Sequence, residues 1–107
     1  MSNMESLNRE IEDIISAAGL AERMGLPTIA SGLYQRAADR QLQLAMRART
    51  PTARGAMCQL AIVWMKKSGD YLRALQISKE LSRDSTLPEI MRVSFESTAK
   101  SLENHQW

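Results

Sequence analysis

The sequence predicts an all-α fold, with about five antiparallel helices in a single domain spanning residues 1–107. Five segments carry apolar residues at steps of three and four, the spacing that places side chains on one side of an α-helix. The five Gly and three Pro residues are expected to separate these segments. No run of residues alternates between apolar and polar with a period of two, so no β-sheet is expected.

The first helix is expected to begin near Ser2 and to end before Gly25. Ser2 and Glu5 have the spacing of a capping box, in which two side chains satisfy free N–H groups at a helix start. Glycine is common just after a helix end. The apolar stripe of this helix consists of Met4, Leu7, Ile11, Ile14, Ala18 and Ala21. This stripe could belong to the core or form the seam of a dimer.

The third helix is expected to begin after Thr50 and to end at Ser68. Thr50 is a favourable N-cap residue, and Pro51 suits the first helical position because its missing N–H would be unpaired there anyway. Nine of the ten residues over 56–65 are apolar, so both sides of this helix avoid water. The third helix is therefore either the most buried element or has one face that meets a partner.

Two turns divide the rest of the chain. Gly69 and Asp70 are expected to make a tight reversal, with a left-handed glycine and an N-cap, into a fourth helix over residues 71–83. Thr86 and Glu89 have the spacing of a second capping box, which predicts a fifth helix that runs nearly to the C-terminus.

The third and fourth helices read Leu60-Ala61-x-x-Trp64 followed by Gly69-Asp70-Tyr71-x-x-Ala74-Leu75. This pattern resembles the helical hairpin of a tetratricopeptide repeat, in which small residues let two helices approach and aromatic rings fill the space between turns. The first two helices resemble a more degenerate copy. The resemblance implies two tetratricopeptide-like hairpins followed by a C-terminal capping helix.

The resemblance also implies an adaptor that holds a peptide or partner helix in a groove lined by the first helix of each hairpin. Carried over to this sequence, that groove contains Ile15, Gly19, Glu22 and Arg23 from the first helix and Cys58, Ile62, Met65 and Lys66 from the third. Two hairpins are fewer than the three or so repeats that usually make such an array stable alone. A homodimer or an obligate complex with a protein partner is therefore expected.

Basic residues concentrate in the middle of the chain. Residues 36–79 contain nine basic and two acidic residues, although the net charge of the whole chain is only +2. Within the second helix, expected to run from Pro27 to about residue 48, Arg36, Arg40 and Arg47 fall on one side. This stripe is either a solvated helix face or a surface for a polyanion, so binding of nucleic acid is the alternative function.

Side chains for catalysis or metal binding are scarce. Cys58 lies in an apolar helical run and is expected to be a buried, unreactive thiol. The only histidine, His105, is the third residue from the end. We expect no catalytic residue, no metal site and no cofactor. The longest apolar stretch, residues 60–65, is far shorter than the roughly 20 residues of a membrane span.

These observations favour a non-enzymatic adaptor or chaperone-like module. A single cysteine cannot form an intramolecular disulfide, which fits a reducing compartment, so a cytoplasmic protein without a membrane segment is expected. The expected partner is a protein or peptide, and nucleic acid is the second candidate.

Overall fold

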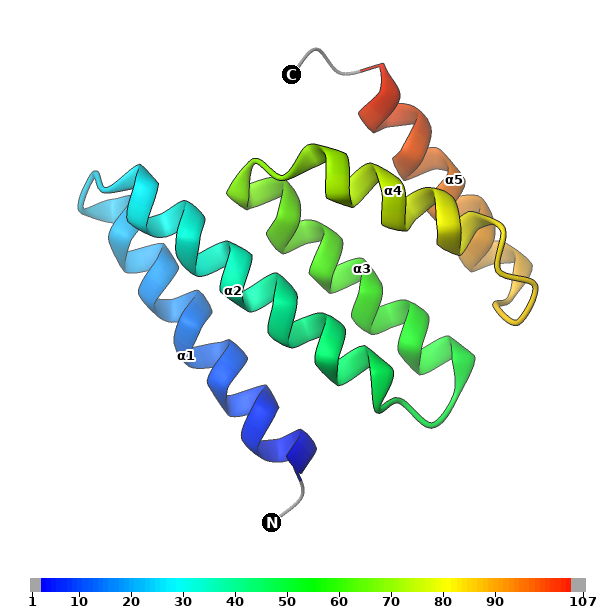
Figure 1. Cartoon of the computed structure of the whole chain (residues 1–107), viewed down its shortest axis with the longest axis horizontal. Coiled ribbons are helices and arrows are strands. Elements are labelled where there is room, and N and C mark those ends of the chain that lie inside the picture. Colours follow the sequence, from blue (N-terminus) through cyan, green and yellow to red (C-terminus); the bar gives the residue numbers. More distant parts are fainter. Residues whose placement is uncertain (1–2, 105–107) are drawn as a thin grey trace.

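The computed structural model describes residues 3–104 and confirms an all-α fold of five helices, with no strand in this range (Figure 1). The helices are α1 (Asn3–Arg23), α2 (Pro27–Met46), α3 (Pro51–Ser68), α4 (Tyr71–Ser82) and α5 (Glu89–Glu103). Their ends lie within two residues of the positions expected from sequence, where those positions fall in the described range. Ser2, and with it the expected first capping box, lies outside the described residues.

The helices form a thin slab. Its principal-axis extents are 43, 41 and 15 Å, and the shortest is only slightly more than the diameter of one helix with its side chains, about 10–12 Å. Figure 1 shows α1, α2 and α3 side by side, while α3 and α4 diverge from their shared turn. The most extensive packing joins α2 to α3, α1 to α2 and α4 to α5. A layer this thin leaves part of most helices exposed.

Local signals at the turns explain where the helices begin and end. The Thr50 hydroxyl accepts a hydrogen bond from the Ala53 N–H at 3.1 Å, and Pro51 occupies the first turn, as expected. Gly69 ends α3 with a φ of 84°, the left-handed conformation that glycine adopts without steric cost. Asp70 stands at the N-cap position of α4, but its side chain makes no capping hydrogen bond.

Glycine does not only separate helices. The expectation that every Gly and Pro falls between helical segments is wrong, because Gly19, Gly32 and Gly55 lie inside helices. At Gly55 the reason is packing: a Cβ atom there would lie 2.7 Å from the terminal carbon of Met91 and 3.1 Å from a methyl group of Leu87. Gly55 therefore leaves space on α3 for the side chains of Leu87 and Met91.

The core is built largely from small residues. Ala61 of α3 and Ala74 of α4 have no exposed surface and lie in one buried cluster with Ala38 of α2 and Phe95 of α5. The apolar stripe of α1 is also buried from Leu7 to Ala21, so the α1 stripe is core and is not available as a dimer seam.

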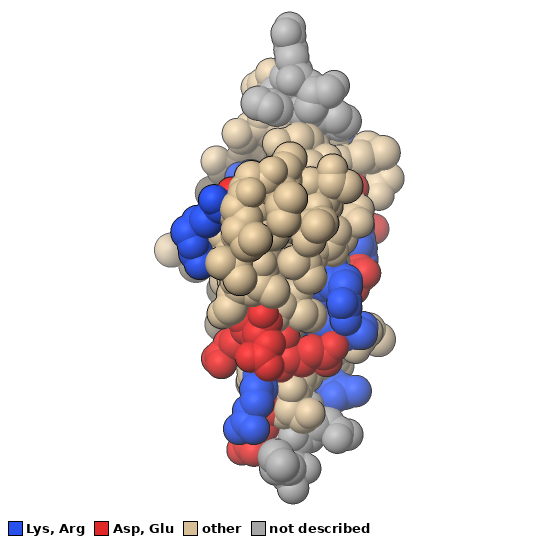
Figure 2. All heavy atoms as spheres, turned by 90° about the vertical axis from the view of Figure 1, so that its left-hand side faces the viewer, with Lys and Arg blue, Asp and Glu red and all other residues tan. Residues whose placement is uncertain are grey.

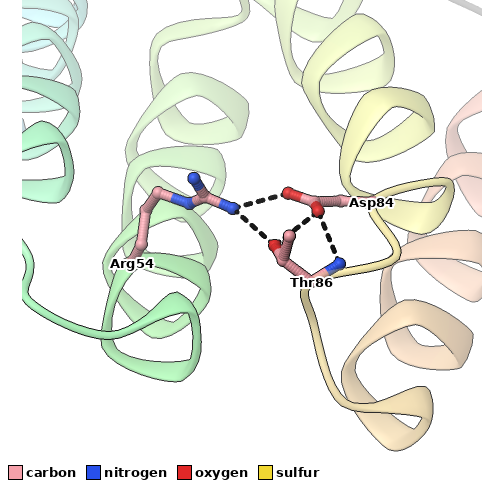
Figure 3. A network of polar contacts seen from close by, with 3 residues as sticks. All are labelled: Arg54, Asp84 and Thr86. Carbon is pink, nitrogen blue, oxygen red and sulfur yellow. Dashed lines mark hydrogen bonds and ion pairs between the residues drawn. The ribbon is translucent and has the colours of Figure 1, made fainter.

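The expected capping box at Thr86 and Glu89 is wrong. The Thr86 hydroxyl and N–H both donate to the Asp84 carboxylate, at 2.6 and 2.9 Å. The Arg54 guanidinium of α3 donates to the same carboxylate at 2.6 Å (Figure 3). Thr86 is thus committed to the α4–α5 loop, and α5 begins after Pro88 with no side-chain cap. The ion pair between Arg54 and Asp84 therefore connects the α4–α5 loop to α3.

The Asp84 carboxyl predicts how stability depends on pH. Hydrogen bonds from Thr86, with the nearby positive charge of Arg54, lower its pKa below the ordinary value of 3.8. A lowered pKa in the folded state adds stability above the ordinary pKa, and this stability is lost as pH falls through the folded-state pKa. We expect Asp84→Asn to be less stable than wild type at pH 7 and to lose less stability than wild type between pH values of about 5 and 2.

Urea denaturation at a series of pH values measures this difference. Glu12→Gln, which removes an exposed carboxylate on α1, serves as the control and should retain the wild-type slope. Equal slopes for wild type and Asp84→Asn would show that the loop contact does not contribute to acid stability.

Candidate protein-binding surface

The residues of α3 that were expected to line a groove lie in the core instead. Cys58, Ile62 and Met65 are 8%, 4% and 1% exposed and belong to the cluster that also contains Ala74 and Phe95. They follow one another at steps of four and three, so they share one helical face, and that face points toward the neighbouring helices. The expectation that these three α3 side chains line a groove is therefore wrong, because they are part of the hydrophobic core.

The expected groove residues of α1 are placed differently. Glu22 and Arg23 are exposed, whereas Ile15 is half-buried against the small cluster that contains Leu7 and Leu44. The Glu22 carboxylate accepts a hydrogen bond from the Tyr34 hydroxyl of α2. Glu22 therefore has a structural role between α1 and α2.

Tyr34 is the centre of a contact that joins three helices. Its ring stacks on Trp64 of α3, with centroids 6.0 Å apart and planes 10° from parallel. The Lys67 ammonium lies 5.4 Å from the centre of the same ring, within the range of a cation–π contact. The hydrogen bond to Glu22, followed by burial, raises the pKa of Tyr34. This arrangement keeps α1, α2 and α3 in register at the end of the slab where α3 finishes.

The outward face of α3 is apolar. Ala56, Leu60, Val63 and Lys67 follow one another at steps of four, three and four, and all four are exposed, with Leu60 at 47% and Val63 at 42%. The sequence predicts that α3 is apolar on both sides, but the side that was expected to meet a partner is the buried one. The missed signal was this second stripe, which ends in a lysine.

Helix α5 adds an uncharged stripe beside this face. Ile90, Ser94, Ser97 and Ser101 follow the same four, three, four spacing and are exposed. The Gln59 amide of α3 donates to the Ser94 hydroxyl at 3.4 Å, which places the two helices next to each other. We use the term α3–α5 surface for the set formed by Ala56, Leu60, Val63, Ile90, Ser94 and Ser97.

One end of the α3–α5 surface opens into a cavity of about 400 Å³. Its lining residues are Lys66, Lys67, Tyr71, Ser101 and Leu102. They come from the end of α3, the start of α4 and the end of α5. Lys66, which was expected in the groove, therefore does lie beside an exposed apolar face, together with Lys67.

The arginines expected to form a stripe on α2 do not act as one set. The Arg40 guanidinium donates to the Glu10 carboxylate of α1 at 2.7 Å, and this contact raises the pKa of Arg40. Arg36 and Arg47 are exposed, and within residues 3–104 neither forms an ion pair. Only these two members of the expected polyanion stripe keep their charge fully available.

Cys58 offers little reactivity. Burial raises the pKa of its thiol, and the positive charge of Arg54 compensates only in part. A thiol with a raised pKa carries little of the thiolate form that acts as nucleophile or metal ligand. The expected buried thiol is confirmed, and His105 lies outside the described residues.

Comparison with known proteins assigns no family to this chain. No family model matches it, and neither a curated protein nor a solved structure is significantly similar to it. Within residues 3–104, no group of three or more His, Cys, Asp or Glu side chains is placed to hold a metal ion. None of the helices in that range combines the length and apolar character needed to cross a bilayer.

The two faces of α3 predict opposite outcomes of mutation. Replacing a buried large aliphatic side chain by a much smaller one costs about 2–5 kcal/mol, and a small domain is stable by about 5–15 kcal/mol. We therefore expect Ile62→Ser/Met65→Ser to unfold the protein, while Leu60→Ser/Val63→Ser keeps the wild-type helical content. Far-UV circular dichroism with urea denaturation distinguishes them. If Ile62→Ser/Met65→Ser had the wild-type urea midpoint, Ile62 and Met65 could not be core residues.

Proposed function

We propose that this chain is a non-enzymatic adaptor that binds a segment of a partner protein, as a peptide or helix, on the α3–α5 surface. The observation that carries the proposal is the exposure of Leu60 and Val63 on α3, beside a stripe of α5 that has no charge. Apolar side chains that remain exposed within a continuous uncharged surface are typical of interaction sites. The free Cys58 thiol fits a reducing compartment, so we place the adaptor in the cytoplasm.

The register between α3 and α5 supports a repeat architecture. Gln59 and Ser94 are hydrogen-bonded and 35 residues apart in the sequence. Lys66 and Ser101 have the same separation and line the same cavity. This offset is close to the tetratricopeptide period of about 34 residues. It supports the proposal that α3 and α5 are equivalent helices of successive repeats, as the resemblance of the α3–α4 motif suggests.

The apolar contacts alone give a modest affinity. Full burial of an exposed Leu, Val or Ile side chain contributes about 1.5–3 kcal/mol, and Leu60 and Val63 are already about half-buried. A complex with a micromolar Kd requires about 8 kcal/mol after the loss of translational and rotational freedom is overcome. A partner must therefore make polar contacts beyond the apolar strip.

Binding of a polyanion is the less favoured function. Arg36 and Arg47 support it because they are exposed and carry no ion pair within the described range. Two unpaired arginines give a small electrostatic term, since affinity for nucleic acid grows with the number of phosphates neutralised.

We also propose that the α1–α2 end mediates self-association. Leu20, Met24, Leu26 and Ile29 are exposed around the α1–α2 turn. Figure 2 shows a broad uncharged bulge at this side of the molecule, with acidic side chains gathered below it. The end repeats of helical arrays usually have a polar outer face, and this one does not. A second copy of the chain, related by a twofold axis, would cover the same patch on both molecules.

Selection from a displayed library of random 16-residue peptides tests the adaptor proposal, with the full chain as target. We expect enriched peptides whose Kd rises at least tenfold on Leu60→Asp/Val63→Asp, because the two charges would be buried at the contact. The matched control is Leu72→Asp/Gln76→Asp, which adds the same charge to an exposed part of α4. Equal affinity for both variants, or no enriched peptide, would refute the adaptor proposal.

Light scattering coupled to size exclusion tests the self-association proposal. We expect the wild-type chain to be dimeric at micromolar concentration and Leu20→Glu/Met24→Glu to be monomeric, because four like charges would meet across a twofold contact. Leu72→Glu/Gln76→Glu is the control and should remain a dimer. A monomeric wild-type protein, or a charge-substituted variant that stays dimeric, would exclude this patch as the contact.

A further inference from the structure

The cavity at the end of the α3–α5 surface is positively charged. Lys66 and Lys67 line it, and neither forms an ion pair with a carboxylate in residues 3–104. The Lys67 ammonium lies 5.4 Å from the centre of the Tyr34 ring, and an ammonium group has three N–H donors. Both side chains can therefore donate hydrogen bonds to a ligand.

The start of α4 adds to this positive potential. Tyr71, the first residue of α4, lines the cavity, and the Asp70 side chain makes no capping hydrogen bond at this helix end. The aligned peptide dipoles of a helix give its first turn a partial positive charge. At the end of α3, by contrast, the N–H groups of Gly69 and Asp70 donate hydrogen bonds to the carbonyl groups of Lys66 and Met65, so these two carbonyl groups are satisfied.

Among residues 3–104, Asp70 and Glu103 are the carboxylates adjacent in sequence to the cavity lining. Asp70 immediately precedes α4, and Glu103 of α5 forms an ion pair with Lys79 at 3.1 Å. Glu103 is therefore already neutralised, while Asp70 offsets one of the two lysines. The cavity keeps a net positive charge, and it is continuous with an apolar strip.

We propose that the partner segment on the α3–α5 surface carries an acidic side chain that enters this cavity and pairs with Lys66 and Lys67. The inference rests on the proposed adaptor function and specifies its ligand: an amphipathic helix with apolar residues on one face and Asp or Glu at one end. The polar contact with the lysines supplies the part of the affinity that the apolar strip cannot.

The dimensions of α3 fix where the acidic residue must stand. From Ala56 to Lys67 the helix advances eleven residues, or about 16 Å at 1.5 Å per residue, which corresponds to about three turns of a partner helix. The two lysines follow Val63 by three and four residues, so one helical turn separates them from the apolar contact. The acidic residue of the partner is therefore expected three or four positions from its last apolar anchor.

The same displayed library of random 16-residue peptides provides the test. Peptides selected on the wild-type chain should be enriched in Asp or Glu three or four positions from an apolar residue. The Kd of a selected peptide for Lys66→Glu/Lys67→Glu should rise at least tenfold, and changing the acidic residue of that peptide to Lys should restore binding to this variant. Lys66→Gln/Lys67→Gln should give a smaller loss, and circular dichroism verifies that both variants are folded.

The control reverses two other exposed charges that have no carboxylate partner among the described residues, in Arg36→Glu/Arg47→Glu. This variant should bind the selected peptides within twofold of wild type. Selected peptides without acidic enrichment, or an affinity that survives reversal of the lysines, would overturn the role of the cavity while the adaptor proposal stands. Acidic peptides that bind Leu60→Asp/Val63→Asp as tightly as wild type would instead overturn the adaptor surface.

Discussion

The close packing of α3 against its neighbours is the constraint on which the rest of the structure depends. Ala61 and Ala74 have no exposed surface, and a Cβ atom at Gly55 would require the side chains of Leu87 and Met91 to shift. Small residues at these points bring helix axes close, so larger side chains between them interdigitate at the density of a protein interior. Once Ile62 is committed to this core, the opposite side of α3 is the only one left to meet solvent or a partner.

Ion pairs join neighbouring elements around this core. Arg40 pairs with Glu10 between α2 and α1, and Arg73 pairs with Asp39 between α4 and α2. Each pair is partly exposed, and such pairs contribute at most about 1 kcal/mol. Their larger effect is on the charge that remains available, because they neutralise arginines of the basic middle of the chain, whereas Lys66 and Lys67 have no carboxylate partner among residues 3–104.

The helices could be predicted from sequence because the signals that end them are local. Thr50 caps α3, Pro51 fits its first turn and Gly69 takes the left-handed conformation, and each of these depends only on residues nearby in the chain. The capping box at Thr86 failed for the opposite reason. Asp84 and Arg54 offer Thr86 stronger, charge-assisted partners, and Arg54 is 32 residues away from it in the sequence.

Which face of α3 is exposed could not be predicted, because the helix has two apolar faces. Periodicity identifies a face, but when nine of ten residues are apolar it cannot decide which face the neighbouring helices cover. The decision is tertiary: residues of α2, α4 and α5 share the buried cluster of Ile62, and Trp64 of α3 packs on a second cluster formed by α1 and α2. The resemblance to a repeat family supplied a register for the groove, and the face that this register selects lies nearly opposite the exposed apolar face of the helix.

Exposed apolar side chains are common on proteins, so exposure alone does not make Leu60 part of a binding site. Its surroundings distinguish it from the others. Met46 and Leu72 are also exposed, but Leu60 continues into Val63 on its own helix, and the neighbouring Gln59 contacts Ser94 of the serine stripe on α5. This uncharged surface ends at a cavity lined by two lysines, so its two ends differ in charge. Under the proposed adaptor function, an apolar middle and one charged end favour one orientation of a bound amphipathic helix over the reverse, because only one orientation places an acidic residue at the lysines.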